Sequence, residues 1–307
     1  MIYDCVIIGG GPAGLNAALV LGRARRNVVI VDDGQPRNRV THESHGYLTR
    51  DHIKPDEFRK IAYEEVLRYP SVEHRVALAE QAQRLDDGHF CIQLQDGQQL
   101  VTRKLLITAG IKEVLPPIQG VTDCYGKSLF NCPFCDGWEL RDQPLAVIGT
   151  ESRMMHLSKM VHTWSQDIIV FTNGTSVLEP AQQLELHEKG IRVIMTPIAE
   201  LQHEQGKLQR IVLTDGVVIE RSGGFVMPQF LPKATFHDTL GYKLNEQGYI
   251  KVDAMGQTSV EGLYSAGDSA FNGPSQLIRA AAEGSLSGAM IHGTLMEEDW
   301  NRQSAVQ

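Results

Sequence analysis

Residues 4–18, "DCVIIGGGPAGLNAA", decide the fold of this 307-residue chain. The apolar run at 4–8 predicts a buried strand, and the glycine-rich segment 9–14 predicts a tight turn. Residues 15–25 have helical composition, and the β-branched run 28–31 predicts a second strand. Strand, glycine turn, helix and strand in this order make a βαβ unit.

The turn matches the pattern GxGxxG through Gly9, Gly11 and Gly14. Glycines at these places allow a tight turn and a close backbone approach, so a pyrophosphate can lie at the helix N-terminus. Asp32 follows Gly14 by 18 residues at the end of the next strand, where it can accept a hydrogen bond from a ribose hydroxyl. Asp33 is the alternative if the strand ends one residue later. We therefore predict a dinucleotide site.

Composition excludes several classes of protein. With 42% hydrophobic and 21% charged residues, the chain has the composition of an ordinary globular protein of about two domains. A net charge of -8 argues against nucleic acid as a partner. No signal peptide or membrane-spanning run is evident, so we expect a cytoplasmic protein. Five cysteines, an odd number, do not suggest a secreted disulfide framework.

Further elements follow in a regular order. Pro116, Pro117 and Gly120 predict a linker. Residues 145–171 repeat the order strand, helix and strand, which predicts a second βαβ unit. The expected elements are a helix at 55–68, a hairpin of 90–94 with 99–101, strands at 104–108, 145–148, 168–171, 191–195, 211–213 and 224–227, and helices at 151–164 and 275–291.

Cys132 and Cys135 form a CxxC motif, followed at once by Asp136. Such a pair can be half of a zinc site, a redox dithiol or core filling. Zinc would need two more ligands, but the chain has no second CxxC, and His42 and His45 are not spaced as a metal pair. We expect no metal site.

Three motifs together resemble the low-molecular-weight thioredoxin reductases and their flavoprotein relatives. They are the opening stretch, the segment "LPPIQGVTDCYGKSLFNCPFCDG" at 115–137 and "GLYSAGD" at 262–268. The resemblance implies an α/β fold of two Rossmann-like, three-layer domains. The FAD domain would comprise 1–115 and 246–307, and 116–245 would be an inserted NAD(P)H-domain-like module carrying the CxxC. It also implies a homodimer.

The same resemblance implies roles for individual residues. Cys135 would face the flavin, Cys132 would exchange with substrate, and Asp136 would transfer the proton. Arg37, Asn38 and His45 contact FAD or shape the dithiol pocket in one interpretation, and in the other belong to a solvated loop. The residues predicted to bind FAD are Gly9, Gly11, Pro12, Ala13, Gly14, Asp32, Arg37, Asn38, His45, Ala109, Gly110, Gly267, Asp268, Gln276 and Leu277.

The second βαβ unit departs from the thioredoxin reductase pattern. Residues 149–154, "GTESRM", keep only the first glycine of a nucleotide fingerprint, and Glu151 would repel a pyrophosphate. Residues 171–175, "FTNGT", contain no cation for the 2′-phosphate of NADPH. NADPH binding is therefore doubtful.

The stretches "GQPRN", "HGYLTRD" and "NCPFCDGWELRD" resemble thioredoxin-reductase-like dithiol oxidases, such as those forming the disulfides of gliotoxin and holomycin, and bacterial relatives. We therefore expect an FAD-dependent thiol-disulfide oxidoreductase that oxidises a small dithiol or a thioredoxin-like protein, with oxygen as acceptor. The alternatives are an NADPH-dependent disulfide reductase and a non-catalytic flavin redox sensor.

Overall fold

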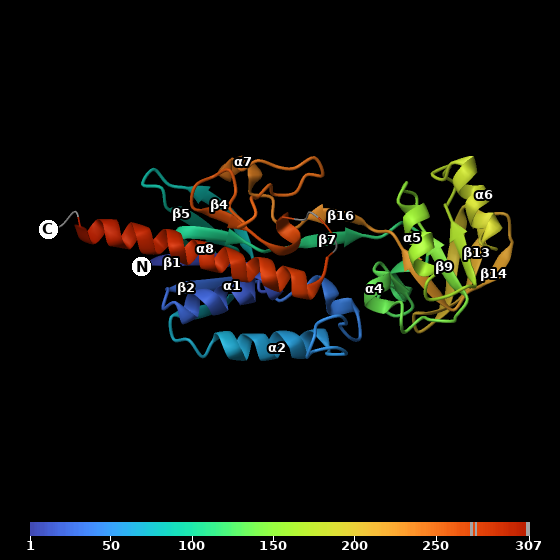
Figure 1. Cartoon of the computed structure of the whole chain (residues 1–307), viewed down its shortest axis with the longest axis horizontal. Helices are drawn as coiled ribbons and strands as arrows, with labels where there is room; N and C mark the ends of the chain where they lie inside the picture. The colour runs from blue at the N-terminus through green and yellow to red at the C-terminus, as the bar shows by residue number, and fades with distance from the viewer. Residues whose placement is uncertain (271–272, 274, 305–307) are drawn as a thin grey trace. The chain divides into compact units, whose positions relative to one another are not determined.

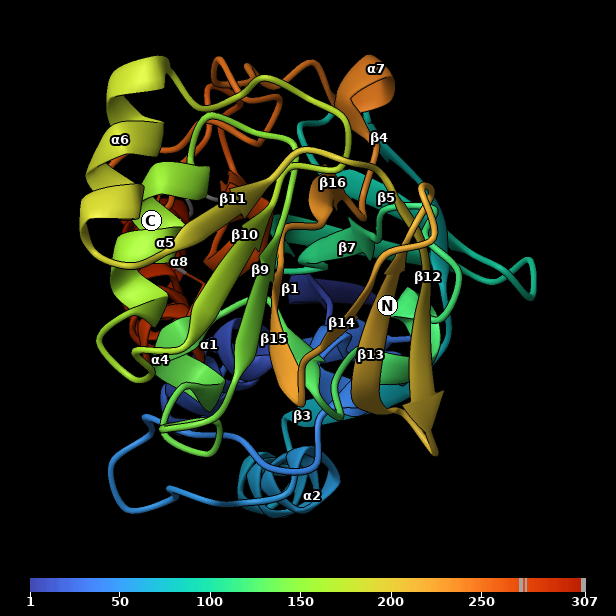
Figure 2. The ribbon, with the colours of Figure 1, turned by 90° about the vertical axis from the view of Figure 1, so that its right-hand side faces the viewer.

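The computed structural model describes residues 1–270, 273 and 275–304, the side chains of 303 and 304 excepted. The chain divides into two compact units (Figures 1 and 2). The first comprises Met1–Arg39, Pro55–Lys112 and Leu231–Gln307, and the second Val40–Lys54 and Glu113–Phe230. These bounds differ from the expected domain bounds, because 40–54 belongs to the second unit and 231–245 to the first.

The first unit is built on a mixed sheet with the strand order β3-β2-β1-β6-β5-β4. Strand β6 is long because its first half pairs antiparallel with β5 and its second half pairs parallel with β17. The hairpin strand at 99–101 and the strand at 104–108 expected separately are thus one strand. The sheet strands are β1 (Ile2–Ile8), β2 (Val28–Asp32), β3 (Val72–Val76), β4 (Ala79–Arg84), β5 (Phe90–Leu94), β6 (Gln99–Ile107) and β17 (Leu263–Ser265).

Helices α1 and α8 pack together on one face of this sheet (Figure 1). Helix α1 begins at Pro12, earlier than expected, because proline is well suited to the first helical position. Side chains alternate along β1, so Cys5 and Ile7 pack against α1 and α8, while Val6 and Ile8 join a second core on the other face. The helices are α1 (Pro12–Arg23), α2 (Pro55–Val66), α7 (His237–Leu240) and α8 (Leu277–Ser304), with short 3₁₀ turns η1 (Arg37–Val40) and η2 (Gly267–Ala270).

The second unit contains a parallel sheet with the order β11-β10-β9-β15-β8. Both faces are covered: α5 and α6 pack on one, and the antiparallel sheet β12-β13-β14 packs on the other (Figure 2). Burial on both faces explains the continuous apolar runs of β9 and β10. The strands are β8 (Leu129–Phe130), β9 (Leu145–Ile148), β10 (Ile168–Phe171), β11 (Arg192–Ile194), β12 (Ile198–Glu204), β13 (Lys207–Leu213), β14 (Val218–Glu220) and β15 (Gly223–Val226).

The helices of this unit are short. They are α3 (Val121–Cys124), α4 (Pro133–Asp136), α5 (Met154–Val161) and α6 (Pro180–Glu188). The chain crosses between the units at β7 (Ile111–Val114) and β16 (Gln229–Pro232), which pair with each other. The expected fold class, α/β with two Rossmann-like domains, is confirmed. No helix in the described part of the chain has both the length and the apolar character that crossing a bilayer requires.

Candidate functional site: a glycine turn and a disulfide

Each glycine of the first turn has its own structural reason. Gly9 has a positive φ of 111°, and a Cβ there would lie 2.3 Å from the carbonyl oxygen of Thr108. A Cβ on Gly14 would lie 2.0 Å from the carbonyl oxygen of Gly9, so this glycine lets α1 pack closely on the strand end. By contrast, a Cβ on Gly11 would meet no atom within 4 Å. The backbone at Gly11 therefore borders open space.

That open space lies at the N-terminus of α1, beside Pro12 and Ala13. Gly11 is the N-cap residue, and no side chain caps the helix. An uncapped helix start leaves backbone N–H groups oriented toward a ligand and carries partial positive charge. Together with the absence of a side chain at Gly11, this arrangement fits the pyrophosphate of FAD.

Asp32 lies at the end of β2, buried next to the turn. Its carboxylate accepts hydrogen bonds from the backbone N–H of Gly10 at 2.6 Å and of Gly34 at 2.9 Å, and it pairs with Arg59 at 2.7 Å. Burial alone would raise the pKa of Asp32, but these donors outweigh it and the pKa is lowered. The carboxylate is thus held ionised, as a ribose acceptor requires.

Asp33, the alternative, binds Lys233 at 2.9 Å instead. Arg59 was not predicted as a site residue, because nothing in the sequence around it indicates that helix α2 places it beside β2. The only indication is that a buried carboxylate such as Asp32 needs a charged partner.

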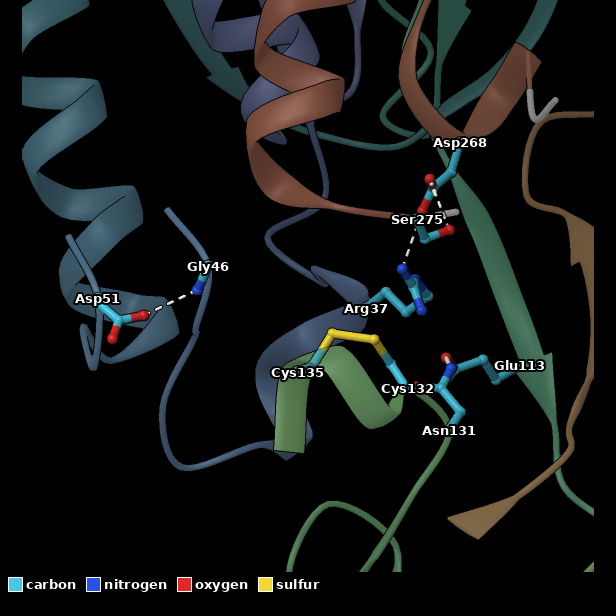
Figure 3. The surroundings of a disulfide bond; sticks show 9 residues. All are labelled: Arg37, Gly46, Asp51, Glu113, Asn131, Cys132, Cys135, Asp268 and Ser275. Carbon is cyan, nitrogen blue, oxygen red and sulfur yellow. Dashed lines mark hydrogen bonds and ion pairs between the residues drawn. A yellow bond between two sulfur atoms is a disulfide. The ribbon is translucent and has the colours of Figure 1, made fainter. Parts of the chain in front are cut away.

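The C-terminal segment contributes a second carboxylate of the first unit. Asp268 in η2 accepts hydrogen bonds from Arg37 at 3.1 Å and from Ser275 at 2.9 Å (Figure 3). Arg37 is thereby joined to a carboxylate 231 residues away, whereas Ser275 is only seven residues from Asp268. Of the other predicted residues, Gly110 donates its N–H to Ser269 Oγ at 2.7 Å and Gly267 donates to Glu283 at 2.9 Å.

Three further predicted residues have known positions. Ala109 packs against the sheet core, Gln276 directly precedes α8, and Leu277 is its first residue. Asn38 lies in η1. Their role in binding FAD stays a prediction.

Cys132 and Cys135 form a disulfide in the second unit, with their Cα atoms 5.3 Å apart (Figure 3). Cys132 is the extended N-cap of α4 and Pro133 begins the helix, so the turn itself brings the sulfurs together. The preceding Asn131 donates a hydrogen bond to Glu113 at 2.8 Å. The CxxC is therefore a disulfide, and its sulfurs are not available as zinc ligands in this state.

Asp136 follows the disulfide on α4 and is only 9% exposed. Burial, with a smaller contribution from the charge of Glu139, raises its pKa to about 7. A carboxyl group with this pKa can both donate and accept a proton near neutral pH. Glu139 was not among the predicted site residues, although its spacing of three residues from Asp136 would place it close on a helical turn.

Two large aromatic side chains flank the disulfide helix. Phe134 and Trp138 are 69% and 62% exposed. Phe134 packs edge-on against Trp164 with ring centroids 5.8 Å apart, and Arg141 stacks over Trp138 at 4.0 Å. These contacts hold apolar surface near the disulfide in a fixed position.

The segment 40–54 belongs to the second unit, with His45 among its residues. His45 is the most buried of the three histidines in this segment, with Asp51 at 3.8 Å from Nδ1 and Glu139 at 3.8 Å from Nε2. The ring of His52 lies against it, with centroids 4.7 Å apart. No local pattern in the sequence pairs His45 with His52, which the fold of the loop brings together.

The turn after β9 differs from the turn after β1. Three residues separate β1 from α1, but five separate β9 from α5. A Cβ on Gly149 would lie 2.6 Å from the Sδ of Met154, the first residue of α5, so this glycine, like Gly9 after β1, is closely packed. Glu151 is tied to Arg153 by a 2.7 Å ion pair in the same turn.

The loop after β10 is closed on itself. The hydroxyls of Thr172 and Thr175 each donate to the other residue's carbonyl, at 2.7 and 2.6 Å. Asn173 accepts a hydrogen bond from the N–H of Ile198 at 2.8 Å. The side-chain oxygens of Thr172, Thr175 and Asn173 thus all make hydrogen bonds within the second unit.

Fold, glycine turn and disulfide together define a flavin-type disulfide oxidoreductase. The chain matches the pyridine nucleotide-disulphide oxidoreductase family over residues 3–284, and it belongs to that family. It is an FAD oxidoreductase of the thioredoxin reductase-like kind, which confirms the resemblance and the expected cofactor.

Individual relatives agree with this placement. A "Probable thioredoxin reductase" of Arthroderma benhamiae is 31% identical, covering 96% of this chain and 81% of that protein. A structure from Bacillus anthracis assigned as thioredoxin reductase TrxB is 42% identical with a TM-score of 0.94, covering 97% of this chain and 99% of that one. The structure of HlmI is 32% identical with a TM-score of 0.95, covering 99% and 96%.

Proposed function

We propose that this protein is an FAD-dependent dithiol oxidase that uses the Cys132–Cys135 disulfide and does not depend on NADPH. The observation that carries the proposal is the turn after β9. Five residues separate β9 from α5 against three between β1 and α1, and the longer turn keeps only the first glycine of the fingerprint and carries Glu151, paired with Arg153. The side chains in place of glycines oppose close approach of a pyrophosphate, and the Glu151 carboxylate adds like charge that Arg153 partly offsets. Electrons then have to enter from a thiol.

The chemistry of the disulfide is a two-step exchange. The first substrate thiol loses its proton to solvent and its thiolate attacks Cys132, the Cys132–Cys135 bond breaks, and Cys135 leaves as a thiolate that takes a proton from Asp136. The second substrate thiol then returns a proton to Asp136 and attacks the substrate sulfur of the mixed disulfide, which closes the substrate disulfide and releases Cys132 as a thiolate that takes a proton from solvent. The enzyme pair thereby gains the two electrons and two protons that the substrate loses.

When bound, FAD would supply the acceptor for these two electrons, with oxygen as the final acceptor and hydrogen peroxide as the product. The residues proposed to hold its pyrophosphate are Gly9, Gly11 and Gly14, with Asp32 for the ribose and Asp268 with Arg37 farther along the molecule. The pKa of about 7 at Asp136 supports its role as the proton donor and acceptor. We further propose that the protein acts as a homodimer in the cytoplasm.

The exposed aromatic pair supports an apolar partner. Phe134 lies between the two cysteines in sequence, and Trp138 follows on the next turn. An apolar small-molecule dithiol would gain burial against these rings. A thioredoxin-like protein partner remains the alternative substrate.

Anaerobic titration of the purified yellow protein tests the direction of electron flow. Dithiothreitol alone should bleach the flavin, and readmitted air should restore it with release of peroxide. NADPH and NADH at micromolar concentration should not bleach it. Rapid bleaching by NADPH would overturn the oxidase proposal in favour of an NADPH-dependent disulfide reductase.

One variant and one turnover measurement test the role of Cys135 and distinguish an enzyme from a redox sensor. Cys135→Ser should retain FAD but lose bleaching by dithiol, and bleaching that is unchanged would remove Cys135 from the mechanism. Turnover distinguishes an enzyme from a redox sensor, because a sensor takes up one equivalent per chain and stops.

A further inference from the structure

Two histidines and a glutamate converge in the segment 40–54. Glu43, His45 and His52 each offer one ligand atom, and these atoms lie within 4.8 Å of one another. Glu43 Oε2 is 3.2 Å from Nδ1 of His52. The ligands of a tetrahedral ion are separated by about 3.4 Å, given metal–nitrogen and metal–oxygen bonds of about 2.1 Å. One pair is thus already at the right distance, and the other ligand atoms need only a small contraction.

Carboxylates also occupy the positions behind the imidazoles. Asp51 Oδ2 lies 3.3 Å from Nε2 of His52, the ring nitrogen opposite to the one that faces Glu43. His45 has a carboxylate at 3.8 Å from either nitrogen, Asp51 on one side and Glu139 on the other. A carboxylate that accepts from the second ring nitrogen is the usual support of a metal-binding histidine, since it fixes the tautomer and orients the ring.

The loop holds these groups in place with its own backbone. Ser44 and Ile53 form an antiparallel bridge that closes the segment at its base. The N–H of Gly46 donates to Asp51 Oδ1 at 2.8 Å (Figure 3). Asp51 is therefore held both by the backbone and beside the two rings.

From this geometry we propose that Glu43, His45 and His52 bind one divalent transition-metal ion of the Zn²⁺ type. Two imidazoles and one carboxylate suit Zn²⁺, whereas Mg²⁺ and Ca²⁺ prefer oxygen ligands throughout. Three protein ligands leave a fourth position for water. Glu43, Asp51 and Glu139 provide the negative charge that compensates the ion. The proposal does not rest on dithiol oxidation, but it assigns His45 to a metal ion in place of the FAD or pocket contact predicted from the sequence.

Calorimetric titration of the full-length protein with ZnCl₂ tests the proposal. The protein should carry FAD, an oxidised disulfide and no polyhistidine tag, so that neither the Cys132–Cys135 dithiol nor a tag can bind zinc; the other three cysteines, Cys5, Cys91 and Cys124, are free but buried. The expected result is one Zn²⁺ per chain, with Co²⁺ giving visible absorption at longer wavelength than the flavin. Mg²⁺ should not compete.

Variants locate the ion. His52→Gln should weaken zinc binding by at least about tenfold, and Asp51→Asn, which removes a negative charge beside both rings and weakens the acceptor of the Gly46 N–H, by up to about tenfold. His52 is an exposed side chain, so its variant should fold, which flavin absorbance and circular dichroism would verify. His42→Gln is the matched control, because His42 lies in the same loop outside the cluster, and it should bind zinc normally.

Two kinds of result would contradict the proposed metal site. An absence of zinc binding, or binding that survives in the double variant His45→Gln with His52→Gln, would refute the site. Competition by Mg²⁺ at equal concentration would contradict imidazole ligation.

Discussion

Replacing Asp136 with Asn should stabilise the second unit by an amount that depends on pH. The buried carboxyl has a pKa of about 7 in the folded chain and an ordinary value of 3.8. Because the folded-state pKa is raised, the wild-type protein is at its full relative stability below pH 3.8 and loses stability as the pH rises to 7. One pH unit is worth about 1.4 kcal/mol, so the total loss is about 4 kcal/mol.

Asn carries no charge at any pH and escapes this loss. The difference in free energy of unfolding between D136N and wild type should therefore increase by about 1.4 kcal/mol per pH unit from about pH 4 to 7 and stay level above 7. Any constant offset from the amide does not affect that slope.

Urea unfolding between pH 4.5 and 8.5 measures the slope. Trp138 and Trp164 belong to the second unit and Trp300 to the first, so the measurement uses a Trp300→Phe background, in which the remaining fluorescence reports unfolding of the second unit. The FAD-loaded protein with the disulfide intact should be used. Asp142→Asn is the matched control, since it removes an exposed carboxylate from the same part of the chain. A difference that is independent of pH, or that decreases as the pH rises, would refute the buried proton at Asp136.

Four further changes test the first unit. Gly11→Ala should leave the unfolding free energy of the FAD-free protein almost unchanged, because its Cβ meets only open space, but the same Cβ should weaken FAD retention by about tenfold or more, about 1.4 kcal/mol. Gly14→Ala should instead lower the free energy of unfolding by about 3 kcal/mol. Equal behaviour of the two variants would contradict the separate roles of these glycines. Asp268→Asn should also weaken FAD retention, by about tenfold in equilibrium dialysis, since Arg37 and Ser275 lose a charged acceptor; unchanged retention would remove Asp268 from the site. Arg103→Met should lower the free energy of unfolding by about 3 kcal/mol, because the side chain of Arg103 is only 11% exposed and pairs with Asp4, Glu298 and Asp299. An unchanged thermal unfolding curve would show that these ion pairs make no net contribution to stability.

Local pattern predicted the central elements well. The strands at 145–148 and 168–171 have the bounds that their apolar runs indicated, and the glycine turn lies where GxGxxG placed it. These segments are decided by composition over a few residues, because a strand buried on both faces has to be apolar throughout.

Elements stabilised by partners elsewhere in the chain were less predictable. Helix α8 was expected to end at 291 but continues to Ser304, where Glu298 and Asp299 pair with Arg103 and Arg26. Strand β4, "AEQAQR", is polar at most positions and is a strand because it pairs with β5. Tertiary contacts decided both cases.

The residues of the candidate site also fall into a group that the sequence predicts and a group that it does not. The CxxC and the acid beside it are contiguous, so the sequence sufficed to single them out. Arg59, Glu139 and His52 are important only through a neighbour that folding supplies, and no local pattern marks them.

The contact between α1 and α8 has a consequence for biosynthesis. A Cβ on Gly284 would lie 1.9 Å from the carbonyl oxygen of Ala13, so the last helix packs directly on the first turn of α1. A growing polypeptide emerges from the ribosome N-terminus first, and the second unit is fully synthesised by residue 230. The dinucleotide turn must then wait for the first third of α8, which contains Gly284, before its surroundings are complete. We therefore expect flavin to be acquired only after this part of α8 has left the ribosome, and nascent chains stalled before residue 277 to lack it.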